Sequence, residues 1–115
     1  MTKEGIERLR KIVYKHDQTV REIMEHYNIT VFDLNNDKRS DSSLTEARGA
    51  IATHLRISGL TWPKLAHVMF KTRATVIHLV RSTIGRAEVD KNFRAKLKGF
   101  GIPLTKPSSI FKSLK

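Results

Sequence analysis

Apolar residues recur at helical spacing near the start of the chain, in two series separated by Asp17: Ile6, Leu9, Ile12 and Val13, then Val20, Ile23, Met24 and Tyr27. Positions three and four apart share one face of an α-helix, and Asp is a common helix cap, so the pattern predicts two amphipathic helices. The apolar run ITVFDL at residues 29–34 is compatible with a strand. Because no second strand candidate accompanies it, one helical turn or a tight connector is favoured.

The centre of the chain begins with a polar segment, residues 35–43, which is rich in turn-forming residues. Ser43 and Glu46 then have the spacing of a capping box, in which each side chain bonds a free backbone amide at the position of the other. This spacing predicts a helix over residues 44–57. Ser58-Gly59 is expected to end it.

Two helices with a short connection follow. Thr61 can cap the first, with Trp62 and Pro63 in its first turn, and its inward positions are Leu65, Val68 and Met69. Lys71-Thr72 supplies a turn and a new cap, and the second helix is expected over residues 73–84, ended by Gly85. Two helices joined by so few residues form a helix-turn-helix candidate.

A last helix is expected over residues 88–98, closing on Gly99, with a flexible basic tail after it. A chain of 115 residues can enclose one modest core. The predicted fold is therefore all-α, a single helical domain with a central helix-turn-helix. Its expected divisions are an N-terminal helix (1–19), the helix-turn-helix domain (20–98) and the tail (99–115).

The helix at residues 73–84 separates its side chains by chemistry. At 100° per residue, one arc is apolar and must face the core: Val76, Ile77, Val80 and Ile84. The opposite arc carries small, hydrogen-bonding or cationic side chains: Ala74, Thr75, His78, Arg81 and Ser82. Arg73 lies at the amino-terminal tip, where free backbone amides and the helix dipole favour an anion such as phosphate. Such a face is typical of a helix that reads the major groove of DNA, although a basic helix can also be only a solvated surface.

The net charge of +11 is concentrated in the second half of the chain. Residues 1–60 hold ten bases and nine acids, whereas residues 61–115 hold twelve bases and only two acids, Glu88 and Asp90. No acidic residue occurs between Glu46 and Glu88. Because lysine and arginine contacts to phosphates release condensed counterions, the simplest partner for this half is a polyanion. A surface that only maintains solubility is the alternative.

Other chemistry finds little support in the sequence. It has no cysteine, which excludes disulfides, thiolate metal sites and cysteine nucleophiles. The five histidines do not pair at the spacing of a zinc motif, and no nucleophile, base and orienting residue can be assembled. No run approaches the roughly 20 apolar residues of a membrane span, and the charged start is unlike a signal peptide. We therefore expect neither an enzyme nor a bound metal or cofactor, and a cytoplasmic, nucleoid-associated protein.

The run from residue 20 to residue 84 resembles the DNA-binding carboxy-terminal domain of the bacterial replication initiator DnaA, which has a Trp-repressor-like helical fold. VREIMEHYNITVFDLNNDKRS resembles the opening helix, connector and basic loop of that domain, and EARGAIATHLRISGLTWPKLAHVMF resembles its long helix and the segment after it. KTRATVIHLVRS resembles the signature Arg-Asp-His-Thr-Thr-Val-x-His-x-x-(Arg/Lys). Here Thr72, Arg73 and Ala74 replace the Asp, the first His and the first Thr of that signature.

The resemblance implies DNA contacts for residues at matching positions. Arg39, beside Lys38 in the basic loop, matches an arginine that enters the minor groove, and Arg48 matches a helix-start contact to the DNA backbone. Pro63 and Lys64 match a segment that approaches phosphates or base edges. The signature itself and the face that continues it comprise Lys71, Thr72, Arg73, Ala74, Thr75, His78 and Arg81. An arginine at the tip can bind guanine or only a phosphate, and the sequence leaves both open.

Two functions from different classes follow. The first is a double-stranded DNA-binding regulator of replication initiation or transcription, with a protein of the replication machinery as a further partner. The second is an adaptor that uses the same fold to contact replication or proteolysis machinery, with the charge-balanced helices within residues 3–27 as its surface. A nucleotide-dependent role is not expected, since the sequence lacks Gly-x-x-x-x-Gly-Lys-(Ser/Thr).

Overall fold

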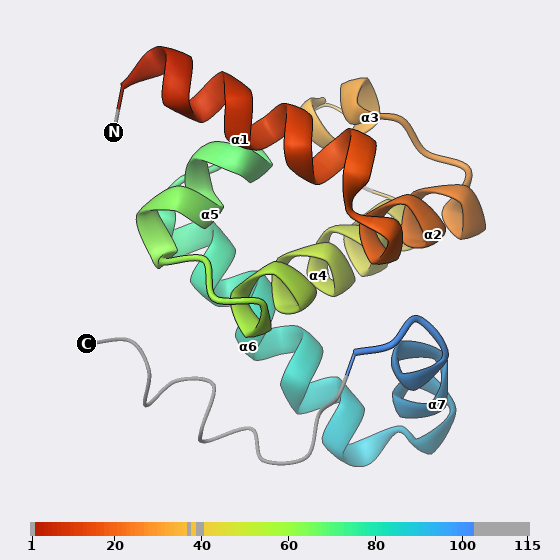
Figure 1. Cartoon of the computed structure of the whole chain (residues 1–115). Coiled ribbons are helices and arrows are strands. Elements are labelled where there is room, and N and C mark those ends of the chain that lie inside the picture. The colour runs from red at the N-terminus through yellow and green to blue at the C-terminus, as the bar shows by residue number, and fades with distance from the viewer. Residues whose placement is uncertain (1, 37, 39–40, 103–115) are drawn as a thin grey trace.

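Helix α4 (Ser42–Ile57) lies at the centre of the molecule (Figure 1). It contacts α2 (Gln18–Tyr27), α3 (Val31–Asn35), α5 (Trp62–Met69) and α6 (Arg73–Val89). Its buried residues lie on every side of the helix, as expected for a helix enclosed by others. The structure is a computed structural model, and it describes residues 2–36, 38 and 41–102.

The remaining two helices pack at the periphery. α1 (Lys3–His16) contacts α2 and α5, and α7 (Lys91–Gly99) contacts α6. The described part of the chain contains no strand, which confirms the predicted all-α fold, and the apolar run at residues 29–34 contributes to helix α3. One hydrophobic core includes residues from all seven of these helices. None of the helices in the described residues is both long and apolar enough to cross a membrane.

Each of the seven helices in the described residues is preceded by a Thr or Asp whose side chain accepts a hydrogen bond from an amide of the first turn. The caps predicted at Asp17, Thr61 and Thr72 are confirmed. The capping box predicted at Ser43 is wrong, because Asp41 Oδ1 accepts the hydrogen bond from the Leu44 amide at 2.9 Å and α4 begins at Ser42. Since Asp41 serves as the cap, Glu46 is not needed there and contacts other helices instead.

Helix α6 is longer than predicted. It continues through Gly85 to Val89, because a glycine inside a helix costs only about 1 kcal/mol and the residues around it, Thr83, Ile84 and Ala87, are buried. Asp90 ends α6 and also caps α7, so α7 begins at Lys91 rather than at residue 88.

The chain continues to pack beyond the predicted start of the tail at residue 99. Gly99 is the last residue of α7, and Ile102 is only 2% exposed within the core. The Ile102 amide also bonds the Leu97 carbonyl at 3.0 Å. Residues 103–115, the rest of the predicted tail, lie outside the described residues.

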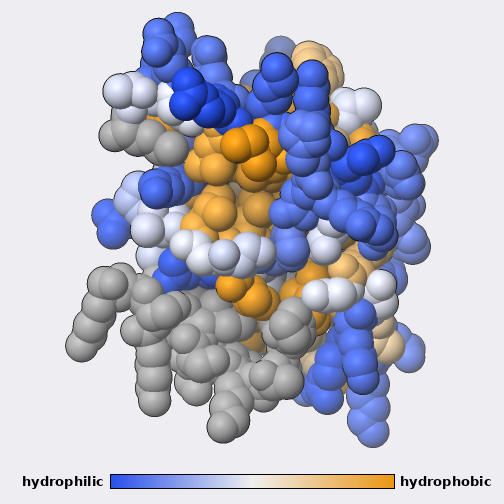
Figure 2. Space-filling model, in the orientation of Figure 1, coloured by the Kyte–Doolittle hydropathy of each residue, from blue (hydrophilic) through white to orange (hydrophobic). Residues whose placement is uncertain are grey.

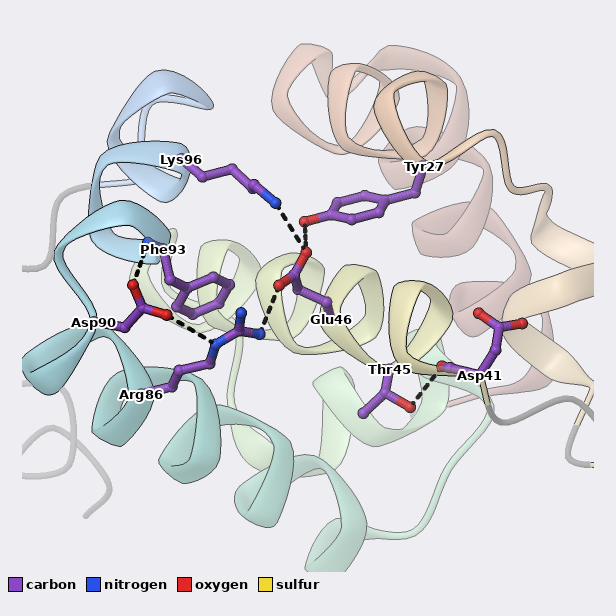
Figure 3. A network of polar contacts seen from close by, with 8 residues as sticks. All are labelled: Tyr27, Asp41, Thr45, Glu46, Arg86, Asp90, Phe93 and Lys96. Atoms are coloured by element: carbon purple, nitrogen blue, oxygen red, sulfur yellow. Dashed lines mark hydrogen bonds and ion pairs between the residues drawn. The ribbon is translucent and has the colours of Figure 1, made fainter.

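The carboxylate of Glu46 in α4 bonds side chains of α2, α6 and α7 (Figure 3). It accepts hydrogen bonds from the Tyr27 hydroxyl of α2, from Arg86 Nη1 of α6 at 2.6 Å and from Lys96 Nζ of α7 at 3.3 Å. The Arg86 guanidinium also lies over the Phe93 ring of α7, 4.1 Å from its centroid. These contacts fix α7 and the second half of α6 against α4.

In the orientation of Figure 1, Figure 2 shows apolar side chains in the middle of the molecule, framed by hydrophilic ones. The large apolar residues that are most exposed belong to three different helices: Ile12 of α1 (51%), Phe32 of α3 (75%) and Val89 of α6 (85%). Single exposed apolar residues are normal on protein surfaces. They do not by themselves define a surface for a protein partner.

Candidate nucleic-acid interface

The connection between α5 and α6 is only three residues long, residues 70–72. Phe70 has a left-handed backbone conformation, with φ of 59° and ψ of 34°. The amides of Phe70 and Lys71 bond the carbonyls of His67 and Ala66 at 3.3 and 3.0 Å, which closes the last turn of α5. The chain then enters α6 at once through its cap, Thr72.

Helix α6 presents the two faces that the sequence predicts. The apolar arc is buried at Val76, Val80 and Ile84 and half-buried at Ile77. The opposite arc and the tip are exposed, and they comprise Arg73, Ala74, Thr75, His78, Arg81 and Ser82. The predicted orientation of this helix is confirmed.

Polar side chains at the start of α6 hold one another in place. Thr72 Oγ1 accepts a hydrogen bond from the Thr75 amide at 3.2 Å, and the two threonine hydroxyls lie 2.8 Å apart. One turn further on, Ser82 Oγ lies 3.4 Å from His78 Nε2. These side chains are exposed and already bond one another, and such preorganisation lowers the entropy cost of binding a ligand.

The cations around this face differ in their surroundings. Lys64 and Arg73 are exposed, and neither side chain bonds another residue in the described part of the chain. Pro63 and Arg81 are also exposed, and Lys71 is half-buried. Lys64 and Arg73 therefore keep their charges available to a ligand.

The basic loop before α4 is described only in part. Lys38 is exposed, and its amide bonds Asn36 Oδ1 at 3.1 Å. Arg39, the residue expected to enter the minor groove, lies outside the described residues.

Arg48, the residue predicted to contact the DNA backbone, bonds the protein itself. It is only 8% exposed, and its Nη2 donates to the carbonyls of Asp33, Leu34 and Asn36 at 3.1, 3.1 and 3.0 Å. These carbonyls lie at the C-terminal end of α3, where a cation complements the helix dipole. Arg48 therefore holds α3 against α4, because its guanidinium bonds carbonyls of the protein itself.

A cavity of about 430 Å³ lies where α4 meets the connection between α5 and α6. Its lining comprises Thr45, Arg48, Phe70, Lys71, Thr72, Thr75 and Leu79. The cavity thus brings Arg48 close to three predicted residues at the tip of α6. The other described residues predicted to bind DNA do not line it: Lys38, Pro63, Lys64, Arg73, Ala74, His78 and Arg81.

Sequence reasoning missed two residues of α1 that bond the last turn of α5, just before the connection to α6. Arg10 Nε and Nη2 donate to the His67 carbonyl at 2.9 and 2.6 Å, and the Tyr14 hydroxyl donates to the Val68 carbonyl at 2.7 Å. Burial raises the pKa of Tyr14 well above its ordinary value, so the hydroxyl stays protonated. The only signal in the sequence was their spacing of four, which places both on one face of α1.

Trp62, in the first turn of α5, packs against the domain. It is 4% exposed, and the Arg56 guanidinium lies 4.6 Å from the centroid of its ring. Within residues 2–36, 38 and 41–102, no three histidine or carboxylate side chains group as a metal site.

Comparison of the chain with protein-family models, with curated proteins and with solved structures finds no match. The resemblance to the DNA-binding domain of the initiator therefore stays a hypothesis, and it rests on the sequence segments quoted above.

Proposed function

We propose that this chain binds double-stranded DNA and that the exposed face of α6 enters the major groove. The observation that carries the proposal is the composition of this face. Small and hydrogen-bonding side chains, Ala74, Thr75 and His78, lie between Arg73 at the tip and Arg81 one turn beyond His78, and all of them are exposed. Side chains of this kind can reach base edges while the arginines meet guanine or phosphates.

The proposed mechanism divides the cations by position. Arg73 lies at the amino-terminal tip of α6, where the helix dipole favours an anion, and it has no partner within the described residues. Lys64, Lys71 and Arg81 contact phosphates beside the groove, and Arg39 reaches the minor groove. Arg48 is assigned to holding α3 in place. A single module of this kind buries roughly 600–1,000 Å² of protein surface, so we expect modest affinity from a monomer.

The biological role we propose is regulation of replication initiation or of transcription, which would place the protein on the nucleoid. The support is the resemblance of residues 20–84 to the initiator domain. Replacement of three signature residues by Thr72, Arg73 and Ala74 leads us to expect a target sequence different from the initiator box, because those positions face the DNA.

Fluorescence anisotropy tests the proposal. The wild-type protein, Arg73→Glu and Lys98→Glu are titrated with a randomised-site duplex pool, the initiator-box duplex and a scrambled duplex across a salt series. Lys98 is an exposed residue near the end of α7, so this control changes the total charge equally, away from the α6 tip. We expect sequence-selective binding by the wild type and by Lys98→Glu, and a loss of about 1–3 kcal/mol or more in Arg73→Glu.

Equal losses in the two charge reversals would mean that binding reflects only total charge. Absence of binding to every duplex would overturn the proposal and favour the adaptor function. Pull-downs with the full chain, and with charge reversals on the exposed faces of α1 and α2, would then identify the partner surface.

A further inference from the structure

Phe70 has an unusual backbone conformation for an aromatic residue. It adopts the left-handed conformation, with φ of 59°, at the point where α5 ends. Glycine and asparagine adopt this conformation readily, whereas a bulky aromatic residue does so rarely and only when its surroundings hold it there. The ring contacts of Phe70 include two side chains of α1.

Two side chains of α1 hold the Phe70 ring. The Arg10 guanidinium lies 4.1 Å from the centroid of the ring, within the range of a cation–π contact. The Tyr14 ring stacks on it, with centroids 6.5 Å apart and an angle of 12° between the planes. The ring is therefore fixed by a cation and by an aromatic partner from the same helix.

The same two side chains hold the backbone before Phe70. Arg10 donates twice to the His67 carbonyl, and Tyr14 donates once to the Val68 carbonyl. Carbonyls in the last turn of a helix lack donors from that helix, and a cation there complements the negative end of the dipole. The last turn of α5 and the ring of Phe70 in the connection are thus both bound to α1.

We infer that Arg10 and Tyr14 are positioning residues for the DNA-reading helix: they clamp the α5–α6 connection and so fix the place of the α6 tip. The inference rests on the proposed function for its consequence in DNA binding. Phe70 is followed directly by Lys71, Thr72 and Arg73, so a change in its backbone conformation moves the tip. If only a fraction of molecules holds the binding-competent connection, the apparent affinity falls by that fraction.

Two variants and one matched control test the clamp. Tyr14→Phe removes only the hydroxyl and keeps the stacked ring, whereas Arg10→Gln removes the guanidinium. Arg8→Gln removes the same charge from an exposed position of α1 whose side chain bonds no other described residue. Because Tyr14→Phe removes only a hydroxyl, it still tests the clamp if Arg10→Gln does not fold.

The first readout needs no DNA. Amide hydrogen exchange of the free protein, followed by NMR, should be about threefold to tenfold faster at Phe70, Lys71 and Thr75 in both variants, as expected for loss of one or two hydrogen bonds. Amides of α7 should exchange at their wild-type rates in both variants. In Arg8→Gln, every amide should exchange at its wild-type rate. Equal acceleration at every amide, or no acceleration at the connection, would overturn the clamp.

The second readout is DNA affinity across a salt series. We expect Arg10→Gln and Tyr14→Phe to bind DNA about threefold to tenfold more weakly. The salt slope should stay unchanged, because the inferred role of both residues involves no contact to a phosphate. A slope lower by about one unit in Arg10→Gln would make Arg10 a phosphate contact and overturn its positioning role. If the wild type binds no duplex, the proposed function fails. The exchange rates still show whether Arg10 and Tyr14 hold the α5–α6 connection in place.

Discussion

At the scale of single residues, Gly49 of α4 leaves no room for a side chain against α6. A Cβ atom built on this residue would lie 2.1 Å from Thr83 Oγ1 of α6, and Thr83 is itself buried. The next atoms, Thr83 Cβ and the Leu79 carbonyl oxygen, would be at 3.5 and 3.6 Å, which are ordinary contact distances. The spacing of α4 and α6 therefore depends on the missing side chain of Gly49 and on one hydroxyl.

We predict that Gly49→Ala lowers the free energy of unfolding. Overpacking usually costs about 1–3 kcal/mol, and the higher helix propensity of alanine offsets part of this cost. Gly85→Ala is the matched control, because its Cβ would meet nothing within 4 Å, and it should stabilise the protein by up to about 1 kcal/mol. Urea denaturation followed by circular dichroism measures both changes.

The double variant Gly49→Ala/Thr83→Ala checks the cause. Removal of the Thr83 hydroxyl leaves only contacts of 3.5 Å or more around the new methyl group, so the double variant should lose less stability than the sum of the single variants. Additive losses would show that the Thr83 hydroxyl does not obstruct the new methyl group.

At the scale of elements, the start of α4 is set by a residue outside the apparent motif. The sequence around Ser43 and Glu46 satisfies the capping-box pattern, yet Asp41 holds the Leu44 amide and Thr45 Oγ1 donates to the Asp41 carbonyl at 3.1 Å (Figure 3). Glu46 points to Tyr27, Arg86 and Lys96 of other helices. The capping-box pattern thus fails because the Glu46 carboxylate bonds side chains that lie far away in the sequence.

We expect Asp41→Ala to cost about 1 kcal/mol of folding stability, the typical value for loss of an N-cap, and Ser43→Ala to cost no more than a few tenths. Thermal unfolding of both variants at neutral pH is the measurement. A larger loss in Ser43→Ala than in Asp41→Ala would restore the capping box as the start of this helix.

At the scale of the whole molecule, Glu46 connects α2, α4, α6 and α7 through one carboxylate. Burial raises the pKa of this carboxyl, but hydrogen bonds from Tyr27, Lys96 and Arg86 outweigh that effect and hold it below its usual range. A group whose pKa is lower in the folded state stabilises the fold above its unfolded pKa, which is about 4.3 for Glu. This stabilisation is lost as the pH falls below that value, through the folded pKa.

The predicted result is a decline in the free energy of unfolding below about pH 4.3 that is smaller in Glu46→Gln, which carries no titrating carboxyl. Tyr27→Phe removes one of the three donors and should reduce the decline by a smaller amount. Urea titrations between neutral and acidic pH measure the three curves. An identical decline in wild type and Glu46→Gln would mean that other carboxyls account for it.

The sequence by itself determined features that depend on a few neighbouring residues. The two faces of α6 follow from periodicity, and the caps at Asp17, Thr61 and Thr72 follow from residue type and spacing, because a helix and its first turn are local structures. The all-α class and the exposed cations of the α6 face were predictable for the same reason.

Only the tertiary structure decided what the side chains of one helix do for another. Arg10 and His67 are 57 residues apart, and no local pattern indicates that they bond. The bonds of Arg48 to the α3 carbonyls and those of Glu46 to other helices likewise follow no local pattern. Gly85 did not end α6, because buried side chains on both sides of it outweigh a local preference of about 1 kcal/mol. Periodicity fixes which face of a helix is buried, whereas the packing of distant helices decides which charges remain exposed to a ligand.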